Sequence, residues 1–295
     1  PDDFRSEYDT LNQAVYSELR FPLNPVTRLI TGVRFEQRDA DYNDNNDEDR
    51  EDSENMWGGK LAIERQLQGG ALAYGLVSRG YKAGGFNTNA SIPDNLRDYD
   101  QETMVNYEVG VKSYWLGNKL KTQLSVFYQE RDNIQIDQSF VQPISGSDCP
   151  CTFEDYIDNA TSGSNYGLEA QFLWIAGDAL TLFGNLGLLE TRFDDFVSFS
   201  HVDADPATGT GVDLEGREQA HSPNWQYSLG FDYYLSNRWV LRLDTEGKDE
   251  FYLGDGHDEK SRSYQLYNAS LSWEPHDWSF AIWIKNLTDE DYYTR

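Results

Sequence analysis

Apolar and polar residues alternate with a period of two through most of the chain. Val15, Leu19 and Phe21 form one apolar set near the start, and Leu229 and Phe231 form another much later. Successive side chains of a β-strand point to opposite faces, whereas a helix repeats about every 3.6 residues. No helical period competes with the alternation. The pattern predicts an all-β protein of about twelve antiparallel strands, each with one apolar and one polar face.

The connections between these strands fall into two classes. Short turns such as "NPVT", "LQGG", "LGNK", "AGDA" and "LSNR" alternate with long polar segments. An outer-membrane β-barrel has short turns on the periplasmic side and long loops outside, while a soluble sandwich has no reason to sort its loops in this way. Strands of roughly ten residues are also long enough to cross a bilayer at a tilt. The connections therefore favour a transmembrane antiparallel β-barrel.

Aromatic residues accompany the short turns. Any one of them is compatible with ordinary core packing, but rings at a shared height beside the turns are typical of the girdle at a membrane interface. The residues are Phe21, Trp115, Trp174, Tyr233, Trp239, Trp273 and Trp278.

Composition narrows the class of protein further. Only 38% of the 295 residues are hydrophobic, and no run of about 18 apolar residues exists, which excludes a membrane-spanning helix. The chain carries 51 acidic and 24 basic residues, a formal charge of −27. A surface that binds nucleic acid must neutralise phosphates, so no nucleic-acid partner is expected. Charged and glycine-rich inner faces suit a wide lumen that is wet or plugged.

Several features that suggest other functions have simpler explanations. Cys149 and Cys151 allow a local disulfide or two free thiols, and neither alternative defines a function. The acidic tract 39–54 lacks the spacing of a calcium-binding EF-hand loop and is expected to be a solvated, mobile loop. His201 lies near two aspartates, which chance in an acidic loop explains better than a metal site.

Enzymatic activity is not expected. All four histidines fall in predicted loops or turns, and none belongs to a nucleophile motif such as Gly-x-Ser-x-Gly. These are His201, His221, His257 and His276. We therefore expect no catalytic residues, no resident metal and no cofactor.

One glycine-rich stretch, "SRGYKAGGFN" at residues 78–87, follows a strand and precedes a polar segment with no helical period, so it is not a phosphate cradle. It resembles the barrel signature of TonB-dependent outer-membrane receptors. Four further segments resemble that family in the same order: the hairpin with Glu108, Gly110 and Lys112, the strand "SNYGLEAQFLW", the Gly-then-Pro strand entry "LEGREQAHSPNWQYSLGFDY", and "KNLTDEDYY" near the C-terminus. The resemblance covers nearly the whole chain.

The resemblance implies a function and a missing part. Such receptors import ferric siderophores or other scarce nutrients through a barrel of about 22 strands. Residues 1–295 are then expected to be a partial barrel domain, without the N-terminal plug domain, the TonB-binding box or the last strands. The implied partners are a ferric siderophore or other small nutrient, the TonB energy-coupling complex, and the lipid and lipopolysaccharide of a Gram-negative outer membrane. A passive porin and a surface binding barrel are the alternatives.

Five residues are candidates for substrate contact. Leu72, Tyr74 and Leu76 are taken as the lipid-facing side of their strand, which predicts that Arg79 and Tyr81 face the lumen. Arg79 would then meet an anionic chelate or, more simply, pair with an acidic residue of a loop or plug. The glycines after it are expected to permit a tight bend. The candidate substrate-binding residues are Arg79, Tyr81, Phe86, Phe140 and Phe199.

Overall fold

The computed structural model describes residues 4–89, 91–143, 151–198, 211–275 and 277–293. Within these residues, twelve strands form one antiparallel sheet in which every strand pairs with its neighbours in chain order. The all-β prediction and the expected number of strands are confirmed. The strands are β1 (Ser6–Asn24), β2 (Thr27–Asp44), β3 (Asp49–Gln66), β4 (Leu72–Lys82), β7 (Glu102–Trp115), β8 (Leu120–Pro143), β9 (Cys151–Gly177), β10 (Leu180–Asp195), β13 (Trp225–Ser236), β14 (Trp239–Lys248), β15 (Tyr264–Trp273) and β16 (Phe280–Ile284).

Short elements complete the described chain. Two small antiparallel pairs lie outside the main sheet, and two 3-10 turns lie between strands. No helix in the described ranges is long and apolar enough to cross a membrane. The pairs are β5 (Gly85–Phe86) with β6 (Asp98–Tyr99) and β11 (Val197–Ser198) with β12 (Val212–Asp213), and the turns are η1 (Gln68–Gly70) and η2 (Asp94–Leu96).

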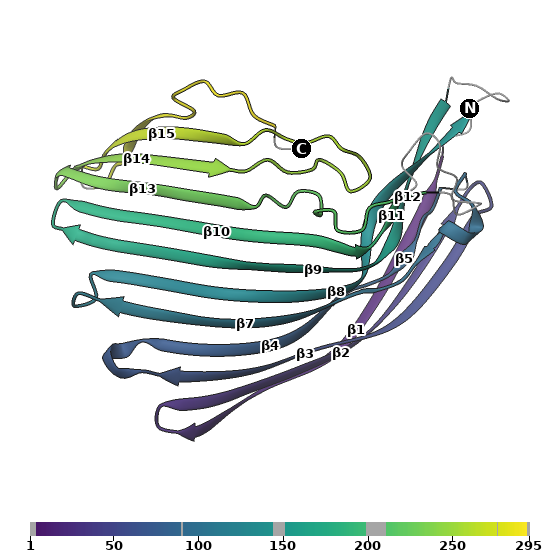
Figure 1. The fold of residues 1–295 in the computed structure, drawn as a ribbon, viewed down its shortest axis with the longest axis horizontal. Coiled ribbons are helices and arrows are strands. Elements are labelled where there is room, and N and C mark those ends of the chain that lie inside the picture. The colour runs from purple at the N-terminus through teal and green to yellow at the C-terminus, as the bar shows by residue number, and fades with distance from the viewer. Residues whose placement is uncertain (1–3, 90, 144–150, 199–210, 276, 294–295) are drawn as a thin grey trace.

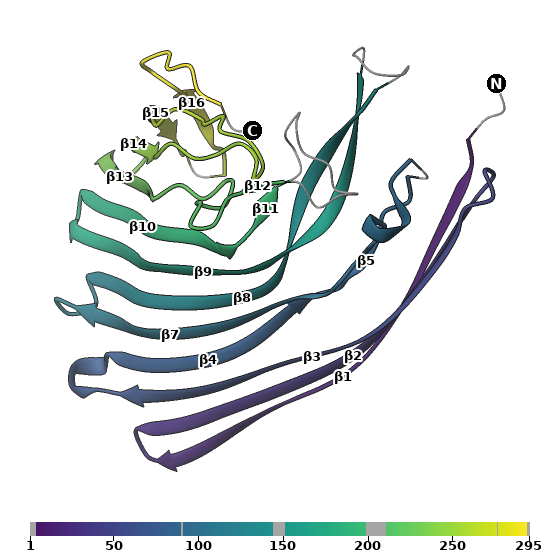
Figure 2. The same ribbon diagram turned by 45° about the vertical axis from the view of Figure 1, so that its right-hand side comes forward.

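The sheet is a curved wall whose two ends differ (Figure 1). Tight connections join the strands at one end, which we call the short-turn end. At the other, the long-loop end, β1 to β3 and β8 to β9 extend well beyond their neighbours (Figure 2). Strands β1 and β16 are the two edges of the described sheet. The predicted short turns therefore lie together at one end of the sheet.

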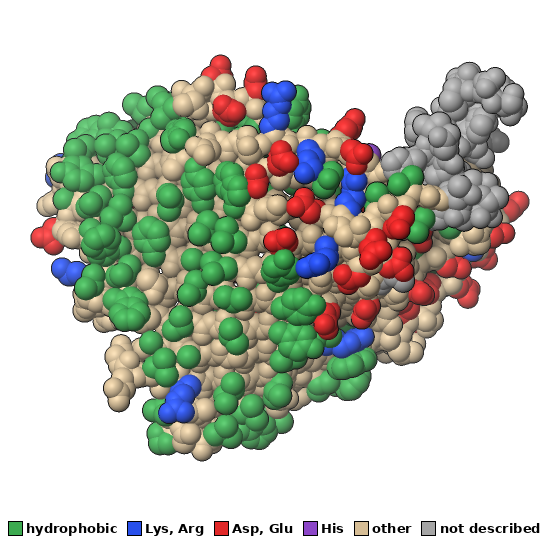
Figure 3. All heavy atoms as spheres, in the orientation of Figure 1, with side chains coloured by type: hydrophobic (Ala, Val, Ile, Leu, Met, Phe, Trp, Pro, Cys, Tyr) green, Lys and Arg blue, Asp and Glu red, His purple; other side chains and the backbone are tan. Residues whose placement is uncertain are grey.

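The two faces of the wall have opposite chemistry. One row of directly paired residues on the apolar face comprises Leu29, Ile63, Gly75, Val109 and Val126. Figure 3 shows hydrophobic side chains spread over the strands and charged side chains gathered toward the long-loop end.

The adjacent row of paired residues, one position along each strand, lies on the polar face. It comprises the directly paired residues Arg28, Glu64, Tyr74, Gly110 and Ser125.

On the apolar face, the predicted apolar side chains Leu124, Val126 and Leu229 are 43%, 48% and 43% exposed, as expected for residues that contact lipid.

The predicted faces of β4 are wrong. Tyr74 lies on the polar face, where its hydroxyl donates a 2.6 Å hydrogen bond to Glu108 Oε1. Gly75 and Val77 lie on the apolar face beside Ile63 and Val109. The physical reason is that both faces of β4 carry apolar residues, so its sequence alone does not distinguish them. Pairing with β3 and β7 decides the orientation.

Two aromatic girdles border the apolar band. At the short-turn end, the rings of Trp239 and Trp273 stack 5.9 Å apart, and those of Trp273 and Phe280 stack 5.6 Å apart. This is the predicted girdle. A second girdle, which the sequence analysis missed, lies toward the long-loop end on the same face. It comprises Phe35, Trp57, Tyr107, Tyr128, Tyr166 and Trp225.

The distance between the girdles fits a membrane. Tyr166 and Trp174 belong to opposite girdles and lie on the same strand, β9. Their separation along the strand is roughly 26 Å at about 3.3 Å per residue. A tilt of about 40° reduces this to about 20 Å along the membrane normal, close to the apolar band of outer-membrane barrels.

The acidic tract 39–54 is not the loop that was predicted. Asp39 pairs with Ser53 and Tyr42 pairs with Arg50, so β2 and β3 continue as a hairpin to a turn at residues 45–48. Alternation persists through the tract, with Ala40 and Tyr42 buried on one side. The charge density concealed this alternation in the sequence.

Candidate substrate site

The chain leaves the wall after β4 and folds back over it before β7 begins. We call residues 83–101 the signature loop, because they contain the end of the glycine-rich stretch together with β5, η2 and β6. Its wall partners Arg38 and Glu54 belong to the polar side of β2 and β3. The signature loop therefore lies on the polar face at the long-loop end (Figure 2).

The glycines of the signature loop permit close approach rather than a bend. Neither Gly84 nor Gly85 has a positive φ. A β-carbon on Gly84 would lie 2.4 Å from the carbonyl oxygen of Tyr99 and 2.8 Å from Glu54 Oε1. One on Gly85 would lie 2.9 Å from the Tyr99 hydroxyl. The expected tight bend is thus replaced by contact between backbones that no larger residue allows.

Hydrogen bonds fix the first turn of the signature loop to the wall. The Gly84 amide donates a 2.8 Å hydrogen bond to Glu54 Oε2, and Arg38 Nη1 donates a 3.1 Å bond to the Gly84 carbonyl. Burial raises the pKa of the Glu54 carboxyl, although the Gly84 amide opposes this shift. Phe86 packs into a buried cluster with Ala40 and Tyr42, its ring centroid 6.3 Å from that of Tyr42.

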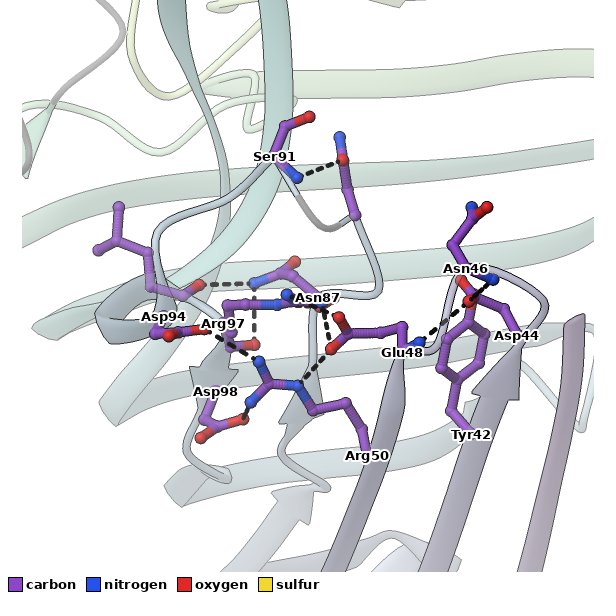
Figure 4. Close-up of polar contacts among 12 residues, drawn as sticks. Tyr42, Asp44, Asn46, Glu48, Arg50, Asn87, Ser91, Asp94, Arg97 and Asp98 are labelled. Carbon is purple, nitrogen blue, oxygen red and sulfur yellow. Dashed lines mark hydrogen bonds and ion pairs between the residues drawn. The ribbon is translucent and has the colours of Figure 1, made fainter.

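An ionic network centred on the buried Arg97 holds the far side of the loop (Figure 4). The Arg97 side chain is 3% exposed and pairs with Glu48 at 2.7 Å. Glu48 also pairs with Arg50 at 2.8 Å, and Arg50 reaches Asp94 at 3.3 Å and Asp98 at 3.8 Å. A buried charge is tolerated only when it is paired and hydrogen-bonded. This network therefore specifies one position of the loop against the β2–β3 hairpin.

Asn87 connects the loop to the second extension. Its side-chain amide donates a 2.9 Å bond to the Ile157 carbonyl and accepts a 2.8 Å bond from the Ile157 amide, both on β9. It also donates to the Leu96 carbonyl at 3.0 Å (Figure 4). The signature loop is consequently joined to the hairpin on one side and to β9 on the other.

A further polar cluster ties the loop to the next connection. Gln135 Nε2 donates to the Ala83 carbonyl at 2.7 Å, and the backbone N–H of Gln135 donates to Glu102 Oε2 at 3.1 Å. Glu102 pairs with Arg131, whose Nη1 donates a 2.7 Å bond to Gln219 Oε1. Gln219 belongs to the segment between β12 and β13, so distant loops share one network.

Below the loop, the polar face contains two hollows lined by hydrogen-bonding groups. One, of about 240 Å³, is lined by Tyr74, Glu108, Lys112, Gln123 and Glu169 among others. The other, of about 380 Å³, adjoins it at Glu169 and continues across β10, β13 and β14. In the described ranges, no group of three or more metal-ligating side chains is present. The arrangement favours binding of a polar ligand or surface.

The five residues predicted to contact substrate do not lie together in the structure. Arg79 does not face the lumen: it lies on the apolar face, and its guanidinium carbon is 4.4 Å from the centroid of the Trp57 ring. Tyr81 contacts the polar side, where its hydroxyl donates a 2.7 Å bond to Glu36 Oε2. Phe86 is 7% exposed within its cluster. The backbone of Phe140 pairs with Glu154, and Phe199 lies outside the described residues.

Sequence reasoning missed the residues that hold the loop and line the hollows. Glu108 and Lys112 belong to a motif that was noted only as a mark of resemblance, and their position on one polar face is the signal that identifies them. Arg97 and Glu48 carried no such signal, because their contact joins positions 49 residues apart. Cys149 also lies outside the described residues, as do His201 and the aspartates beside it.

The wall, its two girdles and its sorted connections define the class of an outer-membrane β-barrel. Residues 1–287 match the family described as TonB dependent receptor-like, beta-barrel, and the chain belongs to that family. The family consists of transport receptors of the Gram-negative outer membrane.

Solved structures share the fold at low identity. The ferric yersiniabactin uptake receptor FyuA from Yersinia pestis matches with a TM-score of 0.76 and 17% identity over 98% of this chain and 42% of its own. The siderophore receptor PiuA from Acinetobacter baumannii matches with 0.76 and 17% over 98% and 40%. The copper transporter OprC matches with 0.71 and 12% over 96% and 43%. The chain thus spans about two fifths of the length of these proteins.

Proposed function

We propose that this chain is the C-terminal part of the barrel of an outer-membrane receptor that imports a ferric siderophore by active, TonB-driven transport. Family membership supports the transport class. Two of the similar structures carry the names of a ferric yersiniabactin uptake receptor and a siderophore receptor, whereas a third is a copper transporter. A plug domain outside residues 1–295 would occupy the lumen and engage the TonB complex.

The observation that carries the proposal is the position of the signature loop. Its contacts with Arg38 and Glu54 support a position on the polar face at the long-loop end, which is extracellular in barrels of this kind. A substrate that enters the lumen from outside must pass this loop. The polar hollows beneath it continue the path along the wall.

The substrate would meet hydrogen-bonding groups rather than a catalytic centre. Tyr81 lies at the entrance, where its phenol ring covers Gly58 and its hydroxyl contacts Arg34 and Glu36. The aromatic ring and nearby guanidinium suit a large anionic chelate. Phe86 lies further toward the tip of the hairpin than Tyr81, in its cluster with Ala40 and Tyr42. The role of Phe140 and Phe199 in binding remains a prediction.

Uptake by cells that produce the full-length receptor tests the proposal. Cells are given a panel of radiolabelled ferric siderophores and a copper complex, with and without an uncoupler that collapses the proton-motive force. We expect saturable uptake of one ferric siderophore that stops when the force collapses. Uptake that continues undiminished would instead identify a passive porin, and surface binding without uptake would identify a binding barrel.

A further inference from the structure

An arginine lies on the membrane-facing side of the wall. On β4, Gly75, Val77 and Arg79 point to the same face, and Arg79 is directly paired with Gly59 on β3 and Val105 on β7. The next row toward the membrane centre contains Val77 paired with Tyr107. Arg79 therefore lies at the level of the girdle of the long-loop end, above the apolar band.

The charge of Arg79 has no acidic partner in the described part of the chain. No ion pair formed among the described residues includes it, although acidic residues outnumber basic ones by about two to one. Its Nη1 donates a hydrogen bond to the Trp57 carbonyl, and its guanidinium lies over the Trp57 ring. The protein thus holds a half-buried cation in place without neutralising it.

An apolar groove runs along the wall directly below this cation. It has a volume of about 550 Å³ and polar groups contribute little to its lining. Gly75 forms its floor, because a β-carbon there would be 3.9 Å from both Ile63 and Val109, at ordinary contact distance. Tyr107 and Tyr128 border its upper end, with ring centroids 6.4 Å apart.

We propose that Arg79 and this groove form a binding site for one lipid of the outer leaflet: a phosphate-bearing, multiply acylated glycolipid of the lipopolysaccharide class. The guanidinium would bind a lipid phosphate, for which its planar set of donors is well suited. The acyl chains would fill the groove between Leu61, Ile63, Val109 and Val126. The inference rests on the proposed membrane orientation and is independent of which nutrient is imported.

The width of the groove favours a lipid with several acyl chains. The row from Leu29 to Val126 crosses five neighbouring strands. At about 4.8 Å between strands, this row spans about 19 Å, so several acyl chains can lie side by side across it. The phosphate also lies where a lipid headgroup belongs, because Arg79 is level with the Trp57 ring and such rings occupy the headgroup region.

Lipid retention by the full-length receptor tests the site. The purified receptor is incubated in mixed detergent micelles with bisphosphorylated, six-chain lipid A, and bound lipid is counted by native mass spectrometry. Arg79→Gln should lower the apparent affinity about tenfold, as loss of one charged hydrogen-bonding group predicts. Gly75→Leu should lower it similarly, because the added side chain fills the groove while leaving the charge intact.

Controls separate this site from general attraction to lipid. Arg65→Gln changes an arginine on the same face at the short-turn end, where Arg65 pairs with Ala73, and should leave retention unchanged. Lipid A without phosphates should bind the unaltered receptor as weakly as bisphosphorylated lipid A binds Arg79→Gln. Equal retention by Arg79→Gln, equal loss in both arginine variants, or equal affinity for phosphatidylglycerol would overturn the proposal.

Folding and transport are checked on the same samples. Each variant should keep the heat-dependent gel mobility of a folded barrel and normal substrate uptake. If Gly75→Leu does not fold, Arg79→Gln and the dephosphorylated lipid still decide the question. Failure of the uptake experiment with intact lipid retention would refute the importer alone, whereas the reverse result would refute the lipid site alone.

Discussion

At the scale of single residues, Gly84 and Gly80 differ in the space available for a side chain, although both belong to the same glycine-rich stretch. Gly84 has no room for a β-carbon between the Tyr99 carbonyl and Glu54, whereas nothing lies within 4 Å of a β-carbon on Gly80. One of the two glycines is therefore required by packing against the wall, and the other is not.

This difference gives the first prediction. Gly84→Ala should weaken docking of the signature loop by about 1–3 kcal/mol, because the obstructing atom of Tyr99 belongs to the backbone and cannot rotate away. Gly80→Ala is the matched control and should have little effect. Hydrogen exchange of the amides in 83–101 measures docking. Equal protection in the two variants would show that close approach is not what selects glycine at Gly84.

The carboxyl of Glu54 makes docking sensitive to pH. Burial raises the pKa of Glu54 in the docked state above its ordinary value near 4.5. The undocked state then binds fewer protons than the docked state between these two pKa values, so the stability of docking falls as pH rises through that window. Above the window the penalty is fully present, and below it the penalty is absent.

We therefore expect the loop amides to be better protected near pH 4 than near pH 8, after correction for intrinsic exchange. Glu54→Gln keeps an oxygen that can accept the Gly84 amide but cannot ionise, so its protection should be independent of pH in this range. Asp49→Asn, an exposed carboxyl of the same hairpin, should leave the pH dependence intact. A Glu54→Gln receptor that still loses protection with pH would assign the effect to another group.

At the scale of elements, β13 shows the difference between the two faces most clearly. Leu229 lies on the apolar face midway between Trp225 and Tyr233, which belong to opposite girdles. Gln226 lies on the polar face and lines the larger hollow. A charge placed at these two positions of one strand therefore enters different surroundings.

The corresponding prediction compares Leu229→Arg with Gln226→Arg. The first should lower the free energy of unfolding by about 2–4 kcal/mol, as expected for arginine facing lipid near the bilayer midplane. The second should change it little, because the polar face remains wet or contacts polar groups. Denaturant titration of the receptor folded into lipid vesicles measures both. Equal destabilisation would contradict the assignment of the faces.

At the scale of the whole molecule, the two ends of the wall differ, so the protein has a defined orientation across the membrane. The β2–β3 hairpin ends in an exposed turn at Asn46. Lys119 is exposed in the tight turn between β7 and β8 at the opposite end. If the long-loop end is extracellular, only the first of these positions can be reached from outside the cell.

Site-specific labelling checks this orientation. In a receptor with Cys149→Ser and Cys151→Ser, a membrane-impermeant maleimide applied to intact cells should label Asn46→Cys and should not label Lys119→Cys. Both should react after the cells are lysed. Labelling of Lys119→Cys alone on intact cells would invert the orientation and remove the basis of the proposed entrance and lipid site.

The sequence by itself determined the strands, the sorting of the turns and most of the faces, because alternation and turn chemistry are local properties. It did not determine the faces of β4, whose apolar residues lie on both sides, and so it misplaced Arg79. The hairpin in the acidic tract, the contact of Arg97 with Glu48 and the need for Gly84 were also decided only by tertiary structure. Each depends on residues that are distant in the sequence and become neighbours only when the strands pair.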